Sequence, residues 1–230
     1  MLQNRGSSLS WLDVTTIVGR IPARTGGRAV STTTQWLTLG GVSEGGILTN
    51  SMTTMATNPL LIVLPLMKVP IWTDLSAVGG PASIFVQDQR PGGLRGHALL
   101  SPGGSSTRLY VIGGQMWNAS TKNWGDMSNR VYEADTLNVN ALVKSSQAGT
   151  VMDKRVVWRR QQDGPPGVAV KHAASFSLEG RMWLHGGEDA EGTTSSSTWS
   201  LETFQAFDPL WTLHSSEPNP GPRKRHCAAV

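Results

Sequence analysis

The segment at residues 108–114 reads RLYVIGG, a short apolar run of strand-forming residues that ends in a glycine pair. Two further segments share this layout, QWLTLGG at residues 35–41 and RMWLHGG at residues 181–187. The second glycines lie at positions 41, 114 and 187, so both intervals are 73 residues. An internal repeat of this kind predicts a fold built from one unit used several times.

Each unit is predicted to contain four short strands, of which the segment before the glycine pair is the second. The first strand is expected within Gly27–Val30, Gly96–Leu99 and Lys171–Ala174, where small apolar residues follow a basic residue or glycine. A third strand is expected at 54–59, 130–136 and 203–209, and a fourth, marked by tryptophan, at 71–75, 157–159 and 210–213. Four short strands cannot bury both of their own faces, so we expect neighbouring units to pack side by side around an axis.

The composition suits many short strands and turns, with 26 Gly, 13 Pro and 9 Trp and only 16% charged residues. A coiled coil is excluded because sustained heptads are missing, and a disulfide scaffold is excluded because Cys227 is the only cysteine. The formal net charge is +4, but the basic residues form short, separate clusters at 154–155, 159–160 and 223–225. A nucleic-acid partner is therefore not expected.

Targeting signals are missing from the sequence. The first ten residues contain no apolar core of a signal peptide, and the longest apolar run, residues 60–67, is far short of the roughly 20 residues that cross a bilayer. We therefore expect a soluble chain, with the cytoplasm as the default location. Membrane association would require an anchor outside this chain.

The order of these features resembles the kelch repeat of β-propellers: an apolar strand, a glycine pair, an aromatic strand, a tryptophan, and then a Pro-x-Arg-x-x-His-Ala segment. The resemblance extends from Trp11 to Val230. It implies an all-β partial propeller with about three four-stranded antiparallel blades and two partial strands at the ends. The implied parts are the last strand of a preceding blade at 10–21, blades at 22–80, 92–164 and 165–214, and the first strand of a following blade at 220–230.

Three departures from the kelch pattern stand out. The interval of 73 residues exceeds the roughly 50 usual for kelch. Arg28 stands where we align His97, His172 and His226, and Asn58 stands where other units have Asp135 and Asp208. Propellers of this type need about four to eight blades to close, so we predict a fragment of a larger propeller or a chain that pairs with another.

Loops carry most functional residues on such scaffolds. In an antiparallel unit the connections after the second and fourth strands emerge on one side, here 76–95, 115–129, 161–170, 188–198 and 214–221; the long connections 60–70 and 137–156 lie on the other. Trp117, Trp124 and Trp199 have no counterpart in the repeat. An exposed tryptophan is a common interface anchor, and the alternative is that these side chains pack against the flank of a blade. The first two share a loop with Asn118, which begins a glycosylation sequon.

Catalytic patterns are weak. Residues 41–45 match G-x-S-x-G, but Gly41 belongs to the repeat and no helix pattern follows. His185 and His214 are not spaced as metal ligands. Copper-radical oxidases with related propellers need two tyrosines and a cysteine, but Tyr110 and Tyr132 occupy repeat positions. We therefore predict no catalytic, cofactor-binding or metal-binding residue.

The resemblance implies a kelch-type protein–protein interaction module that binds a protein partner through its loops and carries out no chemistry. Two alternatives stay open. One is part of an extracellular or membrane-tethered recognition propeller, which a glycan on Asn118 would favour. The other is part of a propeller enzyme, of the copper-radical oxidase or glycosidase type, with its active site in blades outside this chain.

Overall fold

The computed structural model describes residues 2–5, 8–11, 24–31, 35–43, 52–56, 73–74, 91–103, 108–118, 120–135, 158–202, 210–214 and 220–228. Within these ranges the chain is all-β, and all strand pairs are antiparallel. The helical structure in these ranges is a single 3-10 turn, η1 (Pro166–Val168). No helix in the described part of the chain is long and apolar enough to span a membrane.

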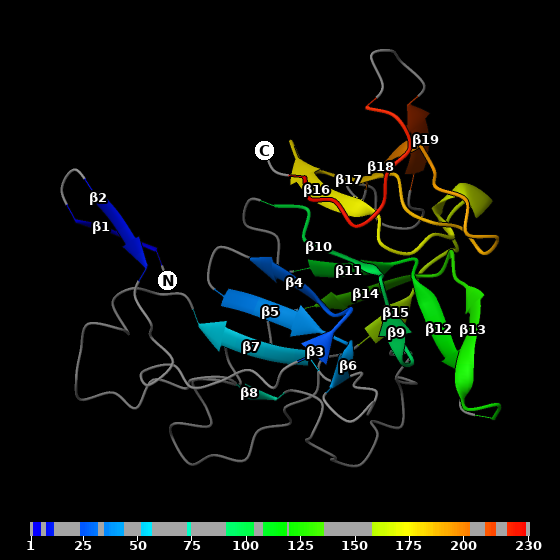
Figure 1. Cartoon of the computed structure of the whole chain (residues 1–230), viewed down its shortest axis with the longest axis horizontal. Coiled ribbons are helices and arrows are strands. Elements are labelled where there is room, and N and C mark those ends of the chain that lie inside the picture. Colours follow the sequence, from blue (N-terminus) through cyan, green and yellow to red (C-terminus); the bar gives the residue numbers. More distant parts are fainter. Residues whose placement is uncertain are drawn as a thin grey trace.

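Three four-stranded sheets follow one another along the chain (Figure 1). The first sheet contains β4 (Arg28–Ser31), β5 (Gln35–Leu39), β7 (Met52–Ala56) and β8 (Thr73–Asp74). The second contains β10 (Ala98–Leu100), β11 (Arg108–Ile112), β14 (Val131–Asp135) and β15 (Trp158–Arg160). The third contains β16 (Ala174–Leu178), β17 (Arg181–His185), β18 (Thr198–Glu202) and β19 (Leu210–His214). In each sheet the strands pair in chain order, so the predicted four-stranded unit is confirmed.

Three smaller sheets complete the described strands. They comprise β1 (Leu2–Arg5) with β2 (Ser8–Trp11), β3 (Arg24–Thr25) with β6 (Val42–Ser43), and β9 (Leu94–Arg95) with β12 (Gln115–Asn118) and β13 (Asn123–Met127).

Neighbouring sheets share hydrophobic cores. The first strands lie in contact, β4 with β10 and β10 with β16. One core joins Leu39 of the first sheet to the second sheet, where Trp158 is 5% exposed. The other joins the second sheet to Met182 and Leu201 of the third, with Trp211 packed against it. Trp158 and Trp211, the fourth-strand tryptophans of the second and third sheets, pack in these cores, and their large apolar area stabilises the contact; Trp72 of the first unit lies outside the described residues.

The glycine pairs connect each sheet to the segment that opens the next. All six of these glycines have positive φ, between 68° and 102°, a conformation that residues with a Cβ rarely adopt. The second glycine of each pair donates its N–H to a carbonyl of the next unit: Gly41 to Leu94 (3.4 Å), Gly114 to Val170 (2.9 Å) and Gly187 to Arg223 (2.8 Å). The glycine pairs thus allow both a turn and a close approach to the next unit.

The third strand of the third sheet differs from the prediction. It is β18 at 198–202, not 203–209, which lies outside the described residues. Trp199 and Leu201 alternate on one face, opposite Leu184 and Met182 of β17. That alternation matches a half-buried strand, so Trp199 belongs to the repeat and not to a loop.

The predicted strands near the two ends also differ. The last strand of a preceding blade was predicted at 10–21. The structure places β2 at Ser8–Trp11, paired with β1, and residues 12–21 lie outside the described ranges. Residues 220–228 contain no strand, although a first strand was predicted at 220–230. They nonetheless run beside the third sheet, where the Arg223 carbonyl accepts from Gly187 and the Arg225 N–H donates to the His172 carbonyl.

The predicted alignment of Arg28 with His97, His172 and His226 is wrong by one position for His172 and by one position for Arg28. Four residues have positive φ at this point of successive units: Gly26, Gly96, His172 and Arg225. The backbone N–H of each of the last three donates to the carbonyl of the one before it in this series, at 3.2, 2.7 and 3.0 Å. These four are therefore equivalent. Counting from them, Arg28 does not replace a histidine; its counterparts are Ala98, Ala174 and Cys227.

Candidate functional site

Trp117 and Trp124 lie on a β-hairpin that projects beside the second sheet (Figure 1). The segment predicted as a loop at 115–129 instead folds into β12 and β13. Trp117 and Trp124 face each other across the two strands, with ring centroids 5.4 Å apart at an interplanar angle of 75°. Both side chains are partly exposed. We call Arg95, Gln115, Trp117 and Trp124 the hairpin site.

Arg95 holds this hairpin in place. Its Nε and Nη2 both donate to Gln115 Oε1, at 2.9 and 2.6 Å, and Gln115 Nε2 donates to the Gly125 carbonyl at 2.9 Å. The Arg95 guanidinium carbon lies 4.2 Å from the ring centroid of Trp124, within the range of a cation–π interaction. The backbone N–H of Trp117 donates to the Gly93 carbonyl at 2.9 Å. Two strands and one arginine thus fix both indole rings.

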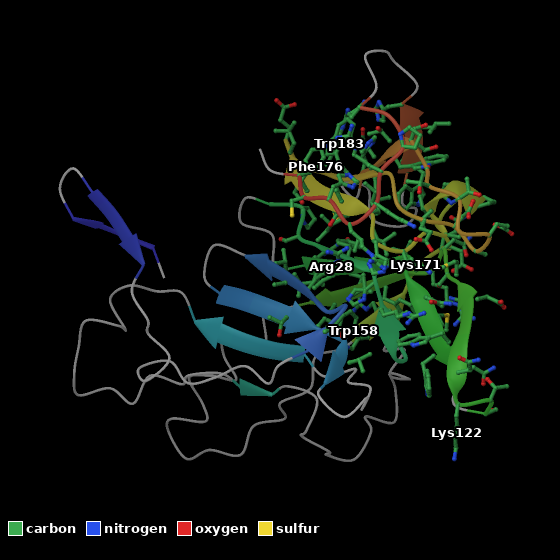
Figure 2. The ribbon with its side chains drawn as sticks, in the orientation of Figure 1. Arg28, Lys122, Trp158, Lys171, Phe176 and Trp183 are labelled. Atoms are coloured by element: carbon green, nitrogen blue, oxygen red, sulfur yellow. The ribbon has the colours of Figure 1, made fainter. Side chains whose placement is uncertain are left out.

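The turn of the hairpin is closed by asparagines. Asn118 Oδ1 accepts from the backbone N–H groups of Ser120 (2.9 Å) and Thr121 (3.2 Å), an Asx turn. Lys122, at the tip in Figure 2, has a φ of 52°, and Asn123 Oδ1 accepts from the Trp124 N–H at 2.8 Å. Local hydrogen bonds therefore order the tip.

The third unit has a charged cluster at the position that corresponds to Arg95 and Gln115 of the second unit. It consists of Glu188, Lys171 and Lys224. Glu188 follows its glycine pair as Gln115 follows Gly114. It accepts from Lys224 Nζ at 2.5 Å and from Lys171 Nζ at 3.0 Å. These two hydrogen bonds, Lys224 first, lower the pKa of Glu188 to about 2, so the carboxylate is ionised at neutral pH. The same contact therefore recurs in two units. In the second unit Arg95, just before Gly96, bonds to Gln115, just after the glycine pair; in the third, Lys171, just before His172, bonds to Glu188.

The other candidates from the sequence lie elsewhere. Trp199 packs edge-to-face with Trp211 at 6.5 Å and against Gly167, which confirms the alternative of packing. Ser43 of the G-x-S-x-G match lies in β6, paired with Arg24, and not at a strand-to-helix turn.

The histidines and tyrosines lie in different surroundings, although the rings of His185 and His226 are in edge-to-face contact, with centroids 5.4 Å apart. His97 is fully buried, whereas His185 and His214 bond to Thr198 and Ser200, each at 2.8 Å. Tyr110 donates to Glu133 at 3.2 Å. In the ranges that the structure describes, no three His, Cys, Asp or Glu side chains are grouped so as to hold a metal ion.

Sequence reasoning identified the two hairpin tryptophans but missed the arginine and glutamine that position them. A signal was present: a basic residue precedes Gly96 and His172, and a polar residue follows the glycine pair in the second and third units. Because these positions pair across β9 and β12, their side chains meet.

No protein-family model matches the chain, and no curated protein matches it. Among solved structures, 135 chains match. One is the structure of YjhT, with a TM-score of 0.59 and 14% sequence identity. The likeness is one of fold. It covers 97% of this chain and 60% of the YjhT chain, so the chain spans less than two thirds of that structure's length.

Proposed function

We propose that the three sheets are successive blades of a kelch-type propeller, and that the chain is part of a protein–protein interaction module whose contact surface is the hairpin site. The module carries out no chemistry of its own. The blade arrangement is supported by the contacts among β4, β10 and β16 and by the glycine-pair hydrogen bonds that recur between units. The fold that the chain shares with YjhT over 97% of its length is compatible with this arrangement.

The observation that carries the interaction proposal is the ordered pair of indoles beside an arginine. Tryptophan and arginine are the residues most enriched among those that dominate binding energy at protein interfaces. A fixed aromatic side chain loses little conformational entropy on binding. The Arg95–Gln115–Gly125 hydrogen bonds provide this preorganisation, because they hold Trp124 before a partner arrives.

The test compares two double variants in affinity capture followed by binding measurements with each purified captured protein. Trp117→Ala with Trp124→Ala removes the anchor. Leu210→Ala with Leu213→Ala is the matched control, because these side chains are also large and apolar, and they are 60% and 50% exposed on β19. We expect a partner that binds the control as tightly as the wild type and binds the tryptophan variant at least about tenfold more weakly. Equal affinity for the tryptophan variant would contradict the proposal.

A further inference from the structure

A cavity lies at the junction of the three sheets and shares no residue with the hairpin site. It has a volume of about 500 Å³ and is lined by the first strands β4, β10 and β16 and by residues 226–228. Its volume lies within the range of small-molecule sites, about 300–1,000 Å³. We call it the Arg28 cavity.

Arg28 is the one permanent charge among the residues that line the cavity. Its side chain is half-buried, and Figure 2 shows it where β4 meets the second and third sheets. Nε donates to the His97 carbonyl at 2.9 Å and Nη2 to the Ala173 carbonyl at 3.3 Å. No carboxylate among the described residues lies within ion-pair distance of it. A guanidinium has five donors, so the two carbonyls leave donors for another acceptor.

The surroundings do not neutralise this charge. Burial lowers the pKa of Arg28 and those of His97, His172 and His226, and neighbouring cationic groups, Arg28 among them, lower the three imidazole values further. These imidazoles are thereby kept neutral near pH 7. Partly burying a cation without a counter-ion is unfavourable, and a bound anion would offset that cost.

The repeat does not require an arginine here. The equivalent positions hold Ala98, Ala174 and Cys227, and the same backbone hydrogen bonds form beside them. The small side chains leave the space that the cavity occupies, whereas Arg28 reaches across to the second and third sheets. A side chain that departs from the repeat, carries charge and faces a cavity indicates a ligand contact.

The rest of the lining suits an organic ligand. Both ring nitrogens of His226 lack a hydrogen-bond partner among the described residues. Val30, Leu99 and Phe176 supply apolar walls, and Ser175 supplies a hydroxyl group. A lone guanidinium fork matches the two oxygens of one carboxylate.

We propose that the Arg28 cavity binds a small organic carboxylate, with its carboxylate on the Arg28 guanidinium, a hydrogen bond from His226, and its apolar body along β10 and β16. This inference does not depend on the proposed protein-binding function, because the two sites share no residue.

Cys227 provides the test, since it lines the same cavity and is the only cysteine in the chain. Iodoacetate and iodoacetamide alkylate a thiol with the same loss of iodide, but only iodoacetate carries a carboxylate. The measurement is the iodoacetate-to-iodoacetamide ratio of alkylation rates, by mass spectrometry, relative to that of N-acetylcysteine. We expect a ratio about tenfold higher for the wild type, as one charge-assisted contact would give. Benzoate should slow alkylation, and benzamide should not.

Two variants assign the effect. Arg28→Ala should bring the ratio to that of N-acetylcysteine, whereas Arg223→Ala, which removes an exposed cation close to Cys227 in the sequence, should leave it raised. A wild-type ratio equal to that of N-acetylcysteine would overturn the proposal, as would a ratio unchanged by Arg28→Ala or equal protection by benzamide. If Arg28→Ala does not fold, the comparison of benzoate with benzamide on the wild type decides.

Discussion

Gly114→Ala tests how closely the glycine pair of the second unit packs against the segment that opens the same unit, Arg95–His97. Gly114 has a φ of 86°, and an added Cβ would lie 2.8 Å from His97 Cβ and 2.9 Å from the Arg95 carbonyl oxygen. The left-handed conformation costs a residue with a Cβ about 1–2 kcal/mol, and overpacking a tight site costs about 1–3 kcal/mol. The smaller entropy of the unfolded alanine chain offsets about 0.4–1 kcal/mol. We therefore expect the free energy of unfolding to fall by about 1–4.6 kcal/mol, with a central value near 3 kcal/mol.

The chain offers a matched control at Gly192, which has a φ of 83° and nothing within 4 Å of an added Cβ. Gly192→Ala carries the conformational cost without the contact, so its loss should be about 1 kcal/mol. Urea unfolding followed by tryptophan fluorescence measures both variants. If Gly114→Ala were no more destabilising than Gly192→Ala, the inferred close packing at the glycine pair would be refuted.

Three further predictions use buried and charged groups. Trp158→Ala should lower the free energy of unfolding by about 3–5 kcal/mol, because Trp158 is 5% exposed between two sheets; a loss below about 1 kcal/mol in urea unfolding would contradict this. Burial lowers the pKa of His97 from 6.5 to about 3, so below pH 6.5 the unfolded chain binds a proton at His97 that the folded chain does not. The free energy of unfolding should therefore fall as the pH is lowered from 6.5 to 3. In urea unfolding at a series of pH values, His97→Gln should lose less stability over this range than the wild type. The pKa of Glu188 is lowered from 4.5 to about 2 by Lys224 and Lys171, so its ion pairs should stabilise the fold above pH 4.5 and lose this effect as the pH falls to 2. The stability difference between wild type and Glu188→Gln should follow that curve, and a difference independent of pH would oppose it.

The sequence predicts well where a physical requirement is local. The segment 108–114 combines a strand pattern with two glycines, and both glycines have positive φ in the structure. Trp158 and Trp211 mark the predicted fourth strands, and both pack in the hydrophobic cores that neighbouring sheets share. The three four-stranded sheets could therefore be predicted.

What the sequence did not reveal depends on contacts between units. His172 and Arg225 adopt positive φ although neither is glycine, because their N–H groups bond to the preceding unit. The bond from His172 to the Gly96 carbonyl makes His172 the counterpart of Gly96, one position away from the His97 with which the sequence aligned it. The hairpin was likewise missed because Arg95 and Gln115 are 20 residues apart and meet only when β9 pairs with β12.

Hydrogen exchange at the glycine amides tests the packing of successive units most directly. The N–H groups of Gly114 and Gly187 donate to Val170 and Arg223 of the following units. Packing of the units side by side predicts that both amide protons are protected about as strongly as those of β11 and β17. Exchange of both at the rate of an unstructured glycine, while the strands stay protected, would show that the units do not meet there and would contradict the account.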